Sequence, residues 1–293
     1  GFDFSLSYQK MEGELNYSIS TNISRVSNKI TRLLGDDSFV IQGGSFHAME
    51  YYTRTIVGSQ VGEFWGYESD GIFQSQDEVD ALTYFDDNGV EQLTYGSTVG
   101  PGDYRYVDQN GDGQLNEEDK VKIGSPYPDF TMGITGDISY KGFDFNIFMY
   151  WSYGNELFNT VKVFTETPYE QTNMSSYMLT DAWRPDNTTA TIAQLGGDRQ
   201  NNYSRSSDRF IENGAFLRFK NISLGYTIPE NVSRKVNIEK LRFYVALQNY
   251  FTITKYSGRD PELGSTWGVF VQKADLGNYT IPKTLNFGIN ASF

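Results

Sequence analysis

Hydrophobic and polar residues alternate one by one at the end of the chain. In Lys283–Phe293, the odd-numbered positions from 285 onward are apolar and the even-numbered positions are polar or glycine. Successive residues of a β-strand point to opposite faces of a sheet, so this segment predicts a strand with one apolar and one polar face. The same alternation recurs in five other runs, which are Phe2–Gln9, Leu15–Ile23, Thr131–Tyr140, Phe143–Ser152 and Leu241–Gln248.

The polar positions of these runs are mostly Ser, Thr, Asn, Gly and Gln. A wet barrel lumen suits such residues, whereas the solvent face of a soluble β-sandwich usually carries more Lys and Glu. Aromatic residues make up 16% of the chain, which is natural for a barrel with aromatic girdles at the membrane surfaces. We therefore predict an all-β, antiparallel transmembrane β-barrel, with a soluble β-sandwich as the alternative.

Strand-like runs are expected at nine places. They lie near residues 2–10, 14–26, 50–58, 61–73, 129–140, 142–154, 210–228, 240–253 and 283–293. A change of phase near Lys220–Asn221 predicts a β-bulge. Ser75 begins a capping-box pattern that predicts a short helix, and 173–183 is a second helical segment.

The connections between these runs fall into two classes. Lys10–Gly13 and Lys141–Gly142 are tight, whereas 74–128, 155–209 and 254–282 are long. Outer-membrane barrels pair short periplasmic turns with long extracellular loops. If the last strand runs inward, alternating strand direction places all three long connections outside. Because the chain begins at Gly1 inside a strand-like run, we expect it to be part of a longer protein.

Acidic residues are concentrated in one segment. Between Glu68 and Asp119 there are fourteen acidic residues and a single base, Arg105, so this segment alone accounts for the net charge of −13. A surface of this sign makes nucleic acid an unlikely partner. We treat 74–128 as a long acidic extracellular loop.

The acidic loop contains a calcium-loop pattern at Asp108–Asp119. An EF-hand loop needs oxygen ligands at positions 1, 3, 5 and 12, a backbone carbonyl at 7 and glycine at 6. The chain offers glycine at position 6 (Gly113) and ligands at the other positions: Asp108, Asn110, Asp112, the carbonyl of Gln114 and Asp119. We predict a structural EF-hand-like metal site for calcium, with magnesium as the second choice. The alternative is a metal-free turn, which Asp, Asn and Gly also form.

The sequence offers few residues for catalysis or for other metal sites. The chain has no cysteine, and His47 is its only histidine, so thiol nucleophiles, zinc clusters and His-based triads are excluded. No pair of carboxylates stands out as acid and base, and we predict that the chain is not an enzyme. Five loop aromatics could stack on sugars or pack the loops together: Tyr169, Tyr177, Trp183, Tyr203 and Trp267.

Several segments, in their order and spacing, resemble the C-terminal part of SusC/RagA-type TonB-dependent outer-membrane transporters of Bacteroidetes. They are Phe64–Tyr67 (FWGY), Ser69–Phe73 (SDGIF), Asp108–Asp119, Gly124–Phe130 (GSPYPDF), Tyr140–Phe145 (YKGFDF), Ser152–Asn155 (SYGN), Leu217–Ile222 (LRFKNI), Leu224–Tyr226 (LGY) and Gln248–Phe251 (QNYF). The resemblance covers most of the chain.

This resemblance implies a fold and a function. Residues 1–293 would be the C-terminal portion of a TonB-dependent receptor barrel, roughly 22-stranded and closed around an N-terminal plug. A SusD-like surface lipoprotein would cap the barrel, and the TonB complex would act through the missing N-terminal part. Such pairs actively import oligosaccharides or peptides across the cell outer membrane for nutrient uptake. The substrate-binding residues stay unknown.

A second function class remains open. The chain could be a non-transporting envelope protein, either a small closed barrel or a calcium-dependent surface glycan-binding module. A plug-like domain elsewhere in the protein would favour transport. A fragment of a wide barrel has open strand edges, and unpaired backbone groups in lipid cost several kcal/mol each.

Overall fold

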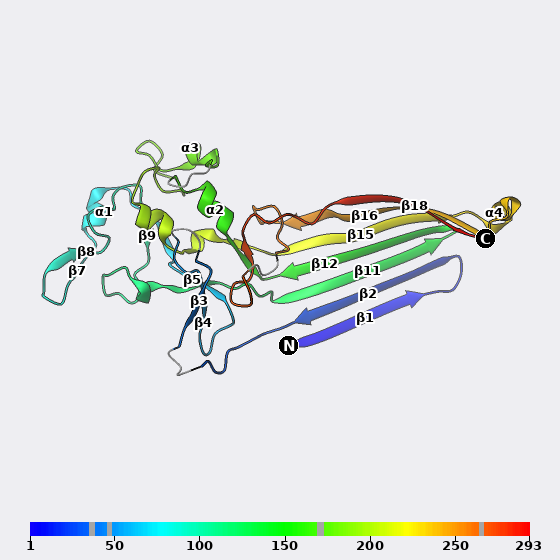
Figure 1. The fold of residues 1–293 in the computed structure, drawn as a ribbon, viewed down its shortest axis with the longest axis horizontal. Helices are drawn as coiled ribbons and strands as arrows, with labels where there is room; N and C mark the ends of the chain where they lie inside the picture. Colours follow the sequence, from blue (N-terminus) through cyan, green and yellow to red (C-terminus); the bar gives the residue numbers. More distant parts are fainter. Residues whose placement is uncertain (35–38, 46–48, 169–172, 264–266) are drawn as a thin grey trace.

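A computed structural model of the chain describes residues 1–34, 39–45, 49–168, 173–263 and 267–293. It consists of one long antiparallel sheet and a cap of short elements at one end of that sheet (Figure 1). His47 and Tyr169 lie outside the described residues.

The long sheet has seven strands in the order β1-β2-β11-β12-β15-β16-β18. Every neighbouring pair is antiparallel. Their bounds are β1 Phe2–Lys10, β2 Leu15–Arg25, β11 Phe130–Tyr140, β12 Phe143–Tyr153, β15 Phe216–Thr227, β16 Lys240–Thr254 and β18 Thr284–Ser292. In the described residues the edge strands β1 and β18 pair on one side only, so the sheet does not close into a small barrel of its own.

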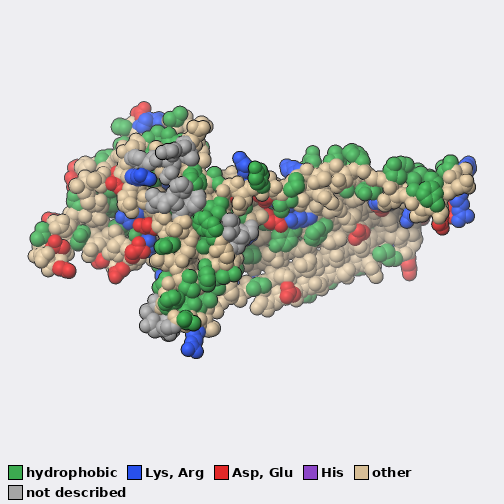
Figure 2. Space-filling view, viewed as in Figure 1, with side chains coloured by type: hydrophobic (Ala, Val, Ile, Leu, Met, Phe, Trp, Pro, Cys, Tyr) green, Lys and Arg blue, Asp and Glu red, His purple; other side chains and the backbone are tan. Residues whose placement is uncertain are grey.

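One face of the sheet is apolar and exposed, as the alternation predicts. Phe4, Leu6, Phe287 and Ile289 each leave more than half of their surface open. Hydrophobic side chains gather along β18 in the space-filling view (Figure 2). Apolar area of this extent on a protein surface marks a contact with lipid or protein.

The other face carries a polar network. Asp137 accepts hydrogen bonds from Ser18 (3.1 Å) and from the amide of Asn146 (2.8 Å). The Asn146 oxygen in turn accepts from Asn221 at 2.7 Å. Arg242 of β16 donates to Asp144 of β12, across the intervening strand β15. These contacts join five of the seven strands across the polar face, and the sheet is therefore two-sided in the way a barrel wall requires.

The predicted bulge is present in β15. Its register shifts between Phe219 and Asn221 against both neighbouring strands. Without this extra residue, Arg218 would share a face with Leu224; with the shift it lies on the polar face. The bulge therefore decides where a buried cation points.

Tight turns and long connections lie at opposite ends of the sheet. Lys141 and Gly142, both at positive φ, join β11 to β12 at the end opposite the cap (Figure 1). The connection from β15 to β16 at that end contains α4 (Glu230–Ser233) and a 3-10 turn (Arg234–Val236). The connections that follow β2, β12 and β16 all lead into the cap.

Two predicted sheet strands were wrong. The runs 50–58 and 61–73 do not join the long sheet, because β2 pairs directly with β11. They form short strands of the cap instead, so 26–129 is a single connection that includes 74–128. Tyr52 and Phe64 are fully buried there, and their apolar pattern reflects a cap core rather than a lipid-facing strand.

Among the residues that the structure describes, the cap contains four small sheets. Their orders are β10-β5-β4-β3, β14-β13-β17, β6-β9 and β7-β8. The strands are β3 Ile41–Gly43, β4 Thr53–Thr55, β5 Glu63–Gly66, β6 Ser69–Ile72, β7 Thr83–Phe85, β8 Glu91–Leu93, β9 Tyr104–Tyr106, β10 Val121–Gly124, β13 Glu156–Asn159, β14 Ile211–Asn213 and β17 Ala274–Asp275.

Short helices complete the cap. They are α1 Gln76–Asp80, α2 Thr160–Thr165, α3 Tyr177–Asp181, a π turn at Gln200–Ser204, and 3-10 turns at Glu117–Asp119 and Asp208–Phe210. Ser75 caps α1 by accepting from the Glu78 N–H, as predicted. Among the described residues, no helix is long and apolar enough to cross a membrane.

The cap core is shared by all three long connections. Tyr52 stacks on Phe158 with ring centroids 4.1 Å apart, and Phe158 stacks on Phe210. Val271, from the last connection, belongs to the same cluster. Each connection therefore depends on the others for its burial.

A buried ion cluster fastens the last connection to the sheet. Arg218 of β15 donates to Asp260 and, at 2.6 Å, to Glu262, while Lys220 pairs with Glu262. Although burial alone would raise it, the hydrogen bond from Arg218 and two backbone N–H groups hold the pKa of Asp260 below its usual range. The carboxylate is thus charged at neutral pH and needs its cation.

We expect Ile147→Arg to destabilise the sheet in its membrane by about 2–4 kcal/mol if the residue lies near the bilayer midplane. Ile147 faces Gly136 and Ile222 on the apolar side. Asn146→Arg is the matched control, because that position lies on the polar face beside Asp137. Urea unfolding of the complete protein in lipid vesicles measures both; equal losses would contradict the assignment of the faces.

We expect Arg218→Met to release the connection 254–282 while the sheet stays folded. The change leaves the Asp260 carboxylate buried without its cation, which costs about 3–5 kcal/mol. Hydrogen exchange of the complete protein should quicken in 254–282 and stay unchanged in β16. Arg234→Gln, at the far end of the sheet, is the control. Unaltered exchange in 254–282 would show that the cluster does not hold this segment.

Candidate functional site

Two places in the cap carry chemistry. One is the acidic loop Asp108–Asp119 that the sequence singles out. The other is a cavity of about 740 Å³ between the three long connections, lined mainly by polar side chains. No sequence motif points to the cavity.

The side chains of the acidic loop fold inward onto its own backbone. Asp108 accepts from the N–H groups of Gly111 and Gly113, both at 2.7 Å. The Asn110 side-chain oxygen accepts from the N–H group of Asp112, and the Asp112 carboxylate accepts from the N–H group of Gln114 at 2.7 Å. The two glycines have φ of +74° and +80°, a conformation that other residues rarely adopt. The loop is thus a chain of side-chain-to-backbone turns.

Asp119 closes the loop. Its carboxylate is fully buried and accepts from the N–H groups of Gln109 (2.9 Å) and Asn116 (2.7 Å). The last predicted ligand is thereby drawn back to the start of the loop. Leu115, at position 8 of the loop, packs against the cluster that contains Tyr67 and Tyr106.

The donor set of the loop suits a hard cation. It comprises carboxylate, amide and carbonyl oxygens, the ligands that calcium takes. In the described part of the chain, no Lys or Arg pairs with Asp108, Asp112 or Asp119, and no group of three or more His, Cys, Asp or Glu side chains is arranged as a metal site. Any ion here would therefore draw on the Asn110 amide and the Gln114 carbonyl as well. The metal site stays a prediction.

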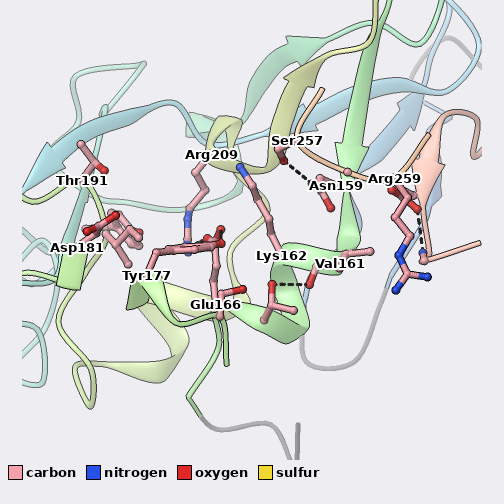
Figure 3. Close-up of a pocket in the computed structure, with 17 residues that line it drawn as sticks. Asn159, Val161, Lys162, Glu166, Tyr177, Asp181, Thr191, Arg209, Ser257 and Arg259 are labelled. Atoms are coloured by element: carbon pink, nitrogen blue, oxygen red, sulfur yellow. Dashed lines mark hydrogen bonds and ion pairs between the residues drawn. The ribbon is translucent and has the colours of Figure 1, made fainter. Parts of the chain in front are cut away.

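The cavity is built from all three long connections (Figure 3). Tyr104 comes from the first, a group between Asn159 and Arg209 from the second, and a group between Ser257 and Gly277 from the third. The cavity exists only because the shared core holds the connections together.

One wall of the cavity is a buried ion pair. Arg209 donates to Glu166 at 3.0 Å and to the Asn202 carbonyl at 2.7 Å, and its guanidinium lies over the ring of Tyr104. The hydroxyl of Tyr177 donates to Glu166 at 2.6 Å. Burial together with this bond to Glu166 raises the pKa of Tyr177 to about 12, so the hydroxyl stays a donor at neutral pH.

Glu212 fixes a second wall. Its carboxylate accepts from Lys162 (2.8 Å), from the Asn159 amide (2.9 Å), and from both the N–H and the hydroxyl of Ser257. Burial would raise the pKa of Glu212, but these donors outweigh it and lower the pKa. Glu212 therefore ties the second and third connections together as an anion.

Two of the loop aromatics take the packing role, and stacking on sugars stays a prediction for the others. Trp183 and Tyr203 are buried and hydrogen-bonded to Gln74 and Gln194, so they pack loops against each other. Tyr177 lines the cavity, and Trp267 is exposed. The sequence could not separate these cases, because each aromatic stands alone in an irregular segment.

Comparisons with known proteins agree along the whole chain, although no family model matches it. It is 29% identical over 303 residues to TonB-dependent receptor P3 of Formosa agariphila, covering 100% of this chain and 28% of that protein. It is also 29% identical over 298 residues to TonB-dependent receptor SusC of Bacteroides thetaiotaomicron, covering 100% of this chain and 26% of SusC.

Solved structures give the same picture for the fold. The RagAB peptide transporter matches with a TM-score of 0.73 at 23% identity, covering 99% of this chain and 29% of that chain. A RagAB peptide importer in the open-open state matches with a TM-score of 0.71 at 24% identity, covering 99% and 28%. The predicted fold class, an antiparallel β-barrel segment, is confirmed.

These relatives carry the names of receptors and transporters rather than enzymes, as the sequence predicts. The chain spans little more than a quarter of their length. Over its whole length, the chain is therefore similar to a segment of SusC-like TonB-dependent receptors and shares its fold with RagAB.

Proposed function

We propose that the chain forms part of the wall and outer rim of an outer-membrane transporter that actively imports nutrients. The observation that carries the proposal is the two-sided seven-stranded sheet, whose long connections all gather into one cap. Relatives named TonB-dependent receptors, which match over the whole chain, support it. The chain covers 28% of the first relative, so a plug and the contact with the TonB complex would come from elsewhere.

The two faces of the sheet would divide the work. The apolar face would lie in the lipid of the outer membrane, and the polar network around Asp137 would line the passage. Substrate would be an oligosaccharide or a peptide. The solved relative described as a peptide transporter supports peptides, and the resemblance to SusC supports oligosaccharides.

The cap would meet a SusD-like surface lipoprotein. The hairpin β7–β8 projects from the cap on the side away from the sheet (Figure 1). Its Phe85 is 70% exposed and Val90 is 52% exposed, with Asp86 and Asp87 between them. An apolar tip with acidic neighbours supports contact with another protein on this side of the cap.

We further propose that the loop Asp108–Asp119 binds calcium in a structural role. Support comes from its all-oxygen donor set and from the carboxylates of Asp108, Asp112 and Asp119, which pair with no Lys or Arg among the described residues; the Lys120 ion pair goes to Glu117 instead. Each carboxylate oxygen that accepts one N–H keeps a second lone pair for an ion. The ion would hold Asp108 at the start of the loop against Asp119 at its end.

Import is tested with the complete protein in its cell envelope. Removing the receptor should abolish uptake of its oligomer, and returning the full-length protein should restore it. The same strain without a working TonB complex is the control and should show no uptake. Uptake that persists without TonB, or turnover of the oligomer by the purified protein, would contradict the proposal.

Calcium binding is tested by titrating the complete receptor in detergent. We expect a dissociation constant of about 10⁻⁴–10⁻³ M, the range of extracellular calcium modules, and at least a tenfold loss in Asp108→Asn. Asp87→Asn, in the neighbouring hairpin, removes the same charge outside the loop and should leave binding unchanged. If wild type takes up no calcium, or if both variants bind alike, the loop is a metal-free turn.

A further inference from the structure

We propose that the cap cavity binds a carboxylate group of the imported oligomer, with Arg259 as its cationic partner. This inference rests on the proposed import function and names the chemistry of the ligand. The cavity lies in the cap, and charged side chains line it on several sides.

Three cations line the cavity, and two of them are neutralised. Lys162 pairs with Glu212 at 2.8 Å, and Arg209 pairs with Glu166 at 3.0 Å. Arg259 is exposed, and no carboxylate among the described residues pairs with it. Because its guanidinium is always charged and offers a planar fork of donors, it suits a carboxylate in bidentate contact.

A buried acceptor marks the same side of the cavity. Asn159 is only 3% exposed, and its Oδ1 has no hydrogen-bond partner. The amide orientation is fixed, since its Nδ2 must donate to the Glu212 carboxylate. A buried acceptor without a donor costs free energy, so the site favours a ligand that brings an O–H or N–H group next to its carboxylate.

An unpaired anion lies at the other side. In Figure 3, Asp181 and Thr191 lie on one side of the view and Arg259 on the other, with Glu166 and Tyr177 between them. Asp181 is exposed, accepts from the Thr180 hydroxyl, and has no cation among the described residues. It can receive sugar hydroxyls or a peptide ammonium group. The cavity thus offers a cation and an anion for opposite ends of one ligand.

The cavity is poorly suited to neutral sugars held by stacking. Its aromatic residues are Tyr104 and Tyr177. The face of Tyr104 is taken by the Arg209 guanidinium, and the residue is 4% exposed. Tyr177 is 37% exposed, so one ring at most is left for stacking. Recognition relies mainly on charge and hydrogen bonds, which again points to a charged oligomer.

The test is calorimetric titration of the complete receptor with three trimers: trigalacturonate, triglutamate and the neutral galactotriose. We expect at least one charged trimer to bind, and Arg259→Gln to weaken it about tenfold or more, the loss of a charge-assisted pair. Arg234→Gln, at the opposite end of the sheet, is the matched control. Asp181→Asn distinguishes the sources, because it should weaken a bound ammonium far more than a bound hydroxyl.

Three results would overturn the inference: neither charged trimer binds, galactotriose binds as tightly as the charged trimers, or Arg259→Gln leaves their affinity unchanged. Measuring uptake of the native oligomer in the Arg259→Gln strain distinguishes failure of this inference from failure of the proposed import function. TonB-dependent uptake that proceeds undiminished in that strain leaves import standing and removes the role of Arg259.

Discussion

Satisfaction of backbone hydrogen bonds in lipid is the constraint on which this structure depends. In the membrane no water can pair with exposed N–H and C=O groups, so strands must pair with each other along their full length. Antiparallel pairing joins all seven long strands, as in the unbroken register of β11 with β12 over Phe130–Tyr140, and only the outer edges of β1 and β18 stay unpaired among the described residues. The alternation of apolar and polar residues follows from the same arrangement, because one face meets lipid and the other meets water.

Outside the membrane, water can pair with backbone groups, and the cap is stabilised by side-chain contacts instead. The cap elements are short, and their carboxylates and amides do much of the joining. Glu212 takes donors from the second and third connections, and Asp260 of the third connection takes one from Arg218 of β15. Glu166 joins Tyr177 to Arg209 within the second connection. Where an ion pair is buried, removing one partner costs more than the pair contributes, so these contacts specify one arrangement of the connections. The bulge in β15 connects the sheet to the cap, because it turns Arg218 to the face where the last connection lies.

The sequence was sufficient for the sheet and insufficient for the cap. Strand β1 was predicted to the residue, and the bulge was placed correctly, because period-two alternation is a local signal with one cause. The runs 50–58 and 61–73 were misplaced. Their Tyr52 and Phe64 are buried in the cap core, and a local sequence pattern cannot tell a residue buried in a protein core from one that faces lipid. The cavity was missed altogether. Asn159, Glu212 and Arg259 come from separate segments that only the fold brings together.

The shared core also limits how the cap can be studied. Phe158 of the second connection stacks on Tyr52 of the first, and Val271 of the third belongs to the same cluster. Deleting one connection would expose the apolar partners left in the other two, so a functional loss after deletion would not locate a site. Side chains that line the cavity without supporting the core, such as Arg259 and Asp181, can be changed one at a time. Single substitutions can therefore separate the role of the cap as a rim from its role as a ligand site, whereas deletion of a connection cannot.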